Sequence, residues 1–155
     1  MELSRIFADH YQFYIYDSDY DHFADDRLNW ATAEAKEFGY ITTEKAIYVK
    51  TVADLNDHRV RVFIDQQPSA SYEQEFSSNI ELVSGKLIVS APANDEDDDL
   101  VVLLEPGNYS IFVCGNSIGK DMFSFDSAYD EEMDDSEYFK HDEFESYDIY
   151  LQKNT

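Results

Sequence analysis

Short segments in which apolar and polar residues alternate, separated by turn residues, constrain this chain more than any other feature. Residues 59–64, for example, alternate through Val60, Val62 and Ile64. A period of two places alternate side chains on one face of a β-strand. We therefore expect strands over most of the chain, at residues 10–17, 46–52, 59–64, 73–83, 86–90, 100–104, 109–114 and 147–151.

The turn residues between these segments predict how the strands connect. Asn56-Asp57 separates residues 46–52 from residues 59–64, and we expect these two strands to pair. Ser84-Gly85 and the sequence from Glu105 to Asn108 both have the composition of hairpin turns. We therefore expect a β-hairpin at each of these two positions.

One short helix is expected over residues 30–38. Asn29 is a suitable N-cap, Ala31, Ala35 and Phe38 share a face, and Gly39 takes the C-terminal cap position. Turn signals recur about every 8–12 residues elsewhere, which is typical of β-sandwiches. The predicted fold is mainly β: an antiparallel β-sandwich of about eight strands with one short helix after the first strand, forming a single acidic domain over residues 1–155.

The composition supports a folded domain in a reducing compartment. Hydrophobic residues make up 43% of the 155 residues and aromatic residues 15%, enough for one sizeable core. Cys114 is the single cysteine, so no internal disulfide can form. Because the first residues lack a basic start with an apolar run, and no stretch approaches about 18 apolar residues, we expect a soluble, cytoplasmic protein without membrane insertion.

A net charge of −23 limits the partners of such a domain. The chain has 34 Asp and Glu against 11 Lys and Arg. Such a field repels nucleic acid and anionic membranes, and it accelerates encounters with basic proteins. We therefore expect a basic protein partner and no direct contact with nucleic acid, while solubility alone is the simpler explanation of the charge.

Residues 126–148 combine this charge with aromatic side chains, and Lys140 is the single Lys or Arg among them. Carboxylates along a loop can occupy the positions of DNA phosphates in a nuclease groove, and aromatic residues can provide desolvated anchors. The alternative is a solvated acidic loop whose aromatic residues contact the core. The candidate partner-binding residues are Asp130, Glu131, Asp134, Asp135, Glu137, Tyr138 and Phe139.

No metal site or cofactor is predicted. Asp17, Asp19 and Asp21 match the start of an EF-hand loop, but His22 stands where glycine is required and Leu28 where a bidentate acid is required. The four histidines share no metal-ligand spacing. A calcium-dependent binding module remains an alternative, in which acids of residues 17–26 and 95–99 meet at one end of the sandwich.

The sequence from Gly115 to Gly119 matches the G-x-S-x-G nucleophile pattern, with Ser117 as the nucleophile and His141 following it. This motif requires a strand leading into a helix within an α/β sheet. The residues after Gly119 lack a helical pattern, so we expect a glycine-rich loop after a strand and no enzymatic activity.

The order of segments resembles the competence protein J family, the inhibitors of DNA-entry nuclease. The residues that carry this resemblance are His10-Tyr11-Gln12-Phe13, an acidic loop, Trp30, Gly39-Tyr40, Ala46-Ile47, residues 59–64 and Pro106-Gly107-Asn108-Tyr109. The resemblance implies a small, non-enzymatic protein that binds and blocks a metal-dependent DNA-degrading nuclease. The long acidic run near the C-terminus departs from the family. An immunity protein against a nuclease toxin is a related alternative, and the sequence leaves the oligomeric state open.

Overall fold

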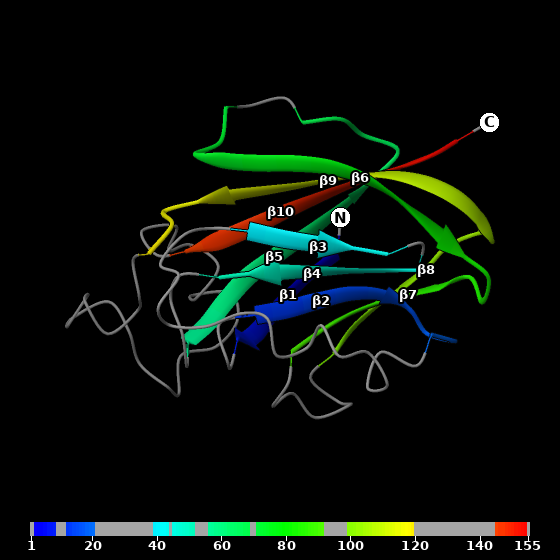
Figure 1. Cartoon of the computed structure of the whole chain (residues 1–155), viewed down its shortest axis with the longest axis horizontal. Coiled ribbons are helices and arrows are strands. Elements are labelled where there is room, and N and C mark those ends of the chain that lie inside the picture. The colour runs from blue at the N-terminus through cyan, green and yellow to red at the C-terminus, as the bar shows by residue number, and fades with distance from the viewer. Residues whose placement is uncertain are drawn as a thin grey trace.

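The protein is a sandwich of two five-stranded β-sheets (Figure 1). The computed structural model describes residues 2–8, 12–20, 39–43, 45–51, 56–68, 71–91, 99–119 and 145–154. Sheet A has the order β1 (Glu2–Ala8), β5 (Asn56–Ile64), β10 (Ser146–Lys153), β9 (Gly107–Asn116) and β6 (Gln74–Leu82). Sheet B has the order β3 (Gly39–Thr42), β4 (Ala46–Lys50), β2 (Gln12–Asp17), β7 (Lys86–Ser90) and β8 (Leu100–Leu103).

The mainly β sandwich predicted from the sequence is confirmed, with ten described strands where about eight were expected. The additional strands are β1 and β3, which lie at sheet edges. Among the described strands, β5 and β10 form the only parallel pair, and all other pairings are antiparallel. The helix expected over residues 30–38 lies outside the described residues.

Alternation along the strands builds the core between the two sheets. In β6, Phe76, Ile80 and Leu82 are buried. In β9, Tyr109, Ile111 and Val113 face the same core. The aromatic rings of Phe13 from sheet B and Tyr147 from sheet A meet with centroids 4.9 Å apart, and aromatic pairs of this kind add about 0.5–1.5 kcal/mol beyond area burial.

Sheet B is buried on both faces at its centre. Phe13 and Ile15 of β2 contact the core between the sheets, whereas Tyr14 points to the opposite face. There Tyr14 packs edge-on against Tyr48 of β4, with ring centroids 5.7 Å apart, and both side chains are buried. This explains why β2 and β4 read as nearly continuous apolar segments in the sequence.

The three strand pairings predicted from turn residues are wrong. The strands at residues 46–52 and 59–64 lie in different sheets, as β4 and β5. Ser84-Gly85 joins β6 of sheet A to β7 of sheet B, and Pro106 joins β8 of sheet B to β9 of sheet A. Turn residues reverse the chain, but they do not determine whether the two strands pair or pass from one sheet to the other.

These two crossovers pack against each other at one corner of the sandwich. The Leu104 N–H donates to the Gly85 carbonyl oxygen at 2.8 Å. Gly85 has a φ of +77°, and a Cβ at this position would lie 2.7 Å from the Leu104 carbonyl oxygen. Glycine is therefore required here both for its backbone conformation and for the close approach of the neighbouring chain.

Asp17 holds the same corner from the end of β2. Its fully buried carboxylate accepts hydrogen bonds from the Val83 N–H at 2.7 Å, from the Ser84 N–H and from the Ser84 hydroxyl. The Asp19 N–H donates to it at 3.3 Å. Burial raises the pKa of Asp17, but these hydrogen bonds outweigh burial and hold the pKa below its ordinary value.

Replacing Asp17 with Asn is expected to lower the free energy of unfolding at neutral pH by about 1–3 kcal/mol, because the amide leaves buried N–H donors poorly satisfied. A carboxyl group whose pKa is depressed by folding contributes stability above its unfolded-state pKa, and this contribution is lost as the pH falls through the folded-state pKa. The difference between wild type and Asp17→Asn in urea unfolding should therefore shrink in acid. Asp19→Asn, at an exposed side chain, is the control, and an equal loss in both variants would contradict the role of Asp17.

Candidate functional site

The residues predicted to bind a partner, Asp130, Glu131, Asp134, Asp135, Glu137, Tyr138 and Phe139, lie outside the described residues. The structure therefore leaves that assignment as a prediction. The described part of the chain contains a different concentration of polar side chains, on the face of sheet A that points away from sheet B.

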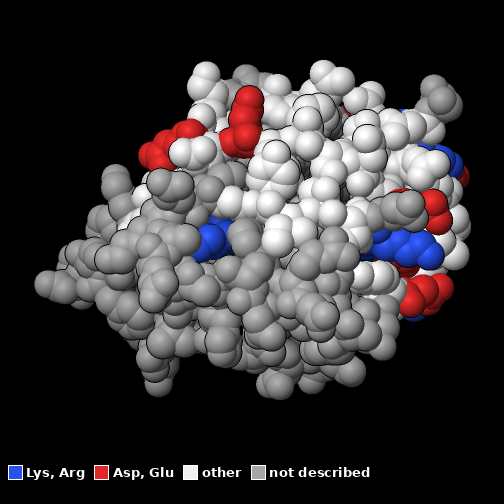
Figure 2. Space-filling model, in the orientation of Figure 1, with Lys and Arg blue, Asp and Glu red and all other residues white. Residues whose placement is uncertain are grey.

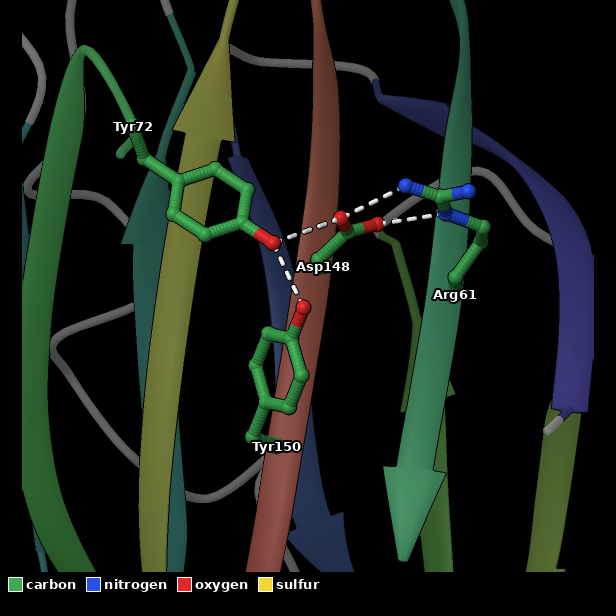
Figure 3. A network of polar contacts seen from close by, with 4 residues as sticks. All are labelled: Arg61, Tyr72, Asp148 and Tyr150. Atoms are coloured by element: carbon green, nitrogen blue, oxygen red, sulfur yellow. Dashed lines mark hydrogen bonds and ion pairs between the residues drawn. The ribbon is translucent and has the colours of Figure 1, made fainter. Parts of the chain in front are cut away.

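Parallel pairing of β5 and β10 places Arg61 directly beside Asp148. Both alternate with core residues, since Val60, Val62, Tyr147 and Ile149 point into the sandwich. The Arg61 Nε and Nη2 donate to the two carboxylate oxygens of Asp148, each at 2.7 Å (Figure 3). The side chain of Asp148 is 5% exposed and that of Arg61 32%. This bidentate geometry, with two parallel N–H···O bonds, is among the strongest forms of ion pairing that Arg makes.

Two tyrosines complete the network. The Tyr72 hydroxyl donates to Asp148 Oδ2 at 3.1 Å, and its oxygen lies 2.5 Å from the Tyr150 hydroxyl (Figure 3). Because Tyr72 gives its proton to Asp148, Tyr150 acts as donor to Tyr72. The Tyr150 ring stacks on Phe63 with centroids 4.8 Å apart, and the Arg61 guanidinium lies 5.5 Å from the Phe63 centroid.

Arg61 and Tyr72 both have pKa values shifted away from neutral pH. Hydrogen bonding to Asp148 raises the pKa of Arg61 above its already high ordinary value. Burial raises the pKa of Tyr72, and the neighbouring Tyr150 and Asp148 raise it further. Arg61 therefore stays charged and Tyr72 stays protonated. Such groups hold a structure or contact a partner, but they do not exchange protons with a substrate near neutral pH.

A hollow of about 390 Å³ adjoins the network, between Arg61 and the turn that follows β9. The other lining residues are Arg59, Tyr72, Glu73, Asn116, Ser117, Ser146 and Asp148. Two hydrogen bonds join Glu73 to the turn after β9 at the border of this hollow. The Glu73 N–H donates to Asn116 Oδ1 at 3.2 Å, and the Ile118 N–H donates to Glu73 Oε2 at 2.9 Å.

Ser117 lies in this turn, but its surroundings differ from those of a hydrolase nucleophile. β9 runs antiparallel to both of its neighbours, whereas the nucleophile elbow belongs to an α/β sheet. In such an elbow the N–H after the serine stabilises the oxyanion. Here the Ile118 N–H is bonded to Glu73, and the Gly119 N–H donates to Glu145 Oε1 at 2.9 Å. His141 lies outside the described residues.

The described acids do not meet at one end of the sandwich as the calcium-module alternative requires. Asp99 precedes β8 and accepts a hydrogen bond from the Ser90 hydroxyl at 2.5 Å, and Ser90 lies opposite Tyr14. Asp17 lies opposite Leu87, at the other end of β2. Within the ranges the structure describes, no group of three or more His, Cys, Asp or Glu is positioned to hold a metal ion.

Cys114 is buried at the edge of this network, opposite Asp148 in the register of β9 and β10. Burial raises the pKa of its thiol to about 12, and the nearby Glu75 and Asp148 contribute. A thiol that stays protonated is a poor nucleophile. Cys114 is therefore a buried, unreactive thiol beside Asp148, on the opposite face of β9 from Ile111 and Val113, which contact the core.

Sequence reasoning missed the Arg61–Asp148–Tyr72–Tyr150 network, because its members are up to 87 residues apart in the chain. A partial signal was present. Arg59 and Arg61 alternate with Val60 and Val62 in a predicted strand, so both had to share the face opposite the core. That pattern predicts which face of the strand carries Arg59 and Arg61, but it does not predict which strand lies beside them.

Comparison with known proteins places the fold. No protein-family model matches the chain, and no curated protein matches its sequence. The structure is similar to that of ComJ, inhibitor of the DNA degrading activity of NucA, from Bacillus subtilis, with a TM-score of 0.63 and 16% identity over 99% of this chain and 94% of ComJ. It is also similar to Crocagin biosynthetic gene J, with a TM-score of 0.60 and 16% identity over 99% and 98% of the two chains. The resemblance to the competence protein J family is thus confirmed at the level of the fold.

No helix in the described part of the chain is both long and apolar enough to cross a bilayer.

Replacing Asp148 with Asn is expected to lower the free energy of unfolding by about 3 kcal/mol, because it removes the charge that pairs with Arg61 and puts an NH2 donor where one of the two acceptor oxygens lies. Urea denaturation followed by far-UV circular dichroism measures the loss. The double variant Arg61→Met with Asp148→Leu removes both charges and should recover most of it. Lys153→Met, which breaks the exposed ion pair with Glu105, is the control and should cost less. A loss no larger than in this control would contradict the structural role of Asp148.

Proposed function

We propose that this chain, which has the fold of ComJ, is a non-enzymatic inhibitor of a DNA-degrading nuclease. The observation that carries the proposal is the combination of this fold over 99% of the chain with a net charge of −23. ComJ is described as an inhibitor of the DNA degrading activity of NucA. A nuclease that binds DNA presents Lys and Arg to phosphates, and a strongly acidic protein is complementary to that surface.

The chemistry of the described surface supports binding over catalysis. Asp148 is engaged by Arg61 and Tyr72, Asp17 by the crossover after β6, and the amides beside Ser117 by Glu73 and Glu145. These groups are used to hold the fold. The proposed contact surface is the acidic and aromatic set from Asp130 to Phe139 named above, whose carboxylates speed the encounter and whose aromatic residues slow dissociation.

The partner is a basic nuclease, and a nuclease toxin neutralised by an immunity protein uses the same complementarity. The distinction is one of biological setting, because either enzyme must present positive charge to DNA. Charge steering acts over about 8 Å at physiological ionic strength, so most of the acceleration arises near contact.

Titration of the purified chain into a DNA-cleavage assay tests the proposal, using the nuclease encoded beside its gene at physiological salt. We expect stoichiometric loss of cleavage that excess Mg²⁺ does not restore, because the protein covers the enzyme and does not sequester its metal. Ser117→Ala should inhibit as well as wild type. Undiminished cleavage at excess protein would overturn the proposal, and recovery with Mg²⁺ would indicate metal capture.

Reversing the charges of Asp130, Glu131, Asp134 and Asp135 to Lys is expected to slow association about tenfold or more and to weaken its salt dependence, because these carboxylates steer the encounter. The matched control reverses Asp95, Glu96, Asp97 and Asp98, which changes the net charge equally. Stopped-flow association rates measure both variants. Equal slowing in the two would show that net charge alone acts and would exclude the first set as the contact surface.

Tyr138→Ala is expected mainly to raise the dissociation rate, since an aromatic anchor contributes after encounter. An unchanged dissociation rate would exclude Tyr138 from the interface.

A further inference from the structure

β6 is a long sheet edge without the prolines, lysines or bulges that often protect edges, and its charged residues are glutamates. It spans nine residues, and β9 is its only partner among the described strands. Its sequence, QEFSSNIEL, contains no Pro, Lys or Gly, and its register with β9 is unbroken from Gln74 to Leu82. Natural proteins protect edge strands with prolines, lysines or bulges, because an open edge pairs with other chains.

The register determines which backbone groups of β6 point outward. The Asn154 N–H donates to the Asn108 carbonyl oxygen at 2.8 Å, so the backbone groups of Asn108 face β10. In an antiparallel ladder this direction alternates along the strand, so those of Tyr109 and Ile111 face β6. Their partners Ile80 and Ser78 are therefore bonded to β9. The outward-pointing N–H and C=O groups belong to the residues between, namely Glu75, Ser77, Asn79 and Glu81, and all four of these residues are exposed.

A hollow beside this edge can receive the side chains of an added strand. β3 forms the edge of sheet B on the same side, and its Tyr40 stacks on Phe76 with centroids 3.9 Å apart. Farther along β6 the inward position is the small Ser78, and Thr42 lies nearby on β3. Together with Ile80, Asn79 and Glu81 they line a hollow of about 410 Å³. The stacked rings of Tyr40 and Phe76 therefore fill the gap between the edge strands β3 and β6 at one end, and the hollow leaves this gap open at the other end.

Charge along the edge indicates the kind of strand that fits. Figure 2 shows acidic side chains over the start of β6 and mostly uncharged ones over the adjoining surface of β6 and β3. Glu73 and Glu75 are exposed at the start of this edge and Glu81 near its end. Opposite charges on neighbouring strands attract, whereas like charges directly opposite repel. A second copy of the chain would bring these acids together and add another −23 charges, so a basic strand is favoured.

We propose that β6 is a strand-addition site, at which an extended segment of the partner nuclease pairs with the outward backbone of Glu75 to Glu81. Lys or Arg side chains of that segment lie beside Glu75 and Glu81, and an apolar side chain enters the hollow at Ser78. This inference rests on the proposed nuclease-inhibitor function and names a contact made by it. Main-chain hydrogen bonds supply affinity and alternate side chains supply selectivity in such complexes.

Amide hydrogen exchange, measured by NMR on the ¹⁵N-labelled full chain with and without the nuclease encoded beside its gene, tests the proposal. In the free chain the amides of residues 76, 78 and 80 should exchange slowly and those of residues 75, 77, 79 and 81 quickly. In the complex we expect the second set to slow by about tenfold or more, while the first set provides an internal reference.

Proline substitution provides the second measurement. Ser77→Pro removes an outward N–H and fits an edge strand, so it should weaken nuclease binding about tenfold while preserving the bonds to β9. Ser77→Ala retains the N–H and should bind as wild type does. The matched pair separates loss of the backbone donor from loss of the side chain.

The outcomes separate this inference from the proposed function. Inhibition with unchanged exchange at residues 75, 77, 79 and 81 would overturn the strand-addition site and leave the inhibitor function standing. Absence of inhibition would overturn both. Slow exchange of these amides in the free chain, with a doubled mass in sedimentation, would assign the edge to a second copy and overturn the proposal.

Discussion

Complete hydrogen bonding of a few buried carboxylates is the constraint on which the arrangement of the two sheets depends. Among the described acidic residues, Asp17, Glu145 and Asp148 are buried, and each buried carboxylate must be compensated by hydrogen bonds or an ion pair. Asp17 accepts hydrogen bonds from N–H groups of the β6–β7 crossover, and Asp148 accepts them from Arg61 and Tyr72. Glu145 accepts a hydrogen bond from the Gly119 N–H. Each carboxylate joins segments that are far apart in sequence. The acidic composition therefore contributes to the architecture as well as to the surface.

The fold class follows from local pattern, whereas the assignment of strands to sheets does not. Residues 86–90 were predicted with the observed bounds, because Lys86, Leu87 and Val89 alternate between clear turn signals. β1 and β3 were missed, since β1 mixes Arg and Ser with apolar residues and β3 has only four residues. The crossovers at Gly85 and Pro106 look like hairpin turns in sequence. Their direction is decided by contacts such as Asp17 with Ser84, across 67 residues of chain.

The candidate sites also differ in whether the sequence alone reveals them. The acidic and aromatic run at residues 126–148 is visible from composition, and it motivates the proposed contact surface. The network of Arg61 and Asp148 exists only because β10 lies between β5 and β9. The open edge of β6 likewise requires the sheet order, since no feature of the sequence QEFSSNIEL shows that one side of it lacks a neighbour among the described strands. Networks between neighbouring strands and open sheet edges can be identified only when the order of the strands is known.

The position of β10 has a consequence for how the molecule folds. β10 follows the nine other described strands in the chain, yet it occupies the middle of sheet A. Until it is in place, sheet A consists of two separate hairpin-like pairs, β1 with β5 and β9 with β6, and Phe13 lacks its aromatic partner Tyr147. Completion of sheet A therefore depends on contacts of long sequence separation, a topology that is typical of slow-folding proteins. A ribosome-bound chain that lacks β10 would expose the facing edges of β5 and β9 to other chains, and insertion of that single strand covers both.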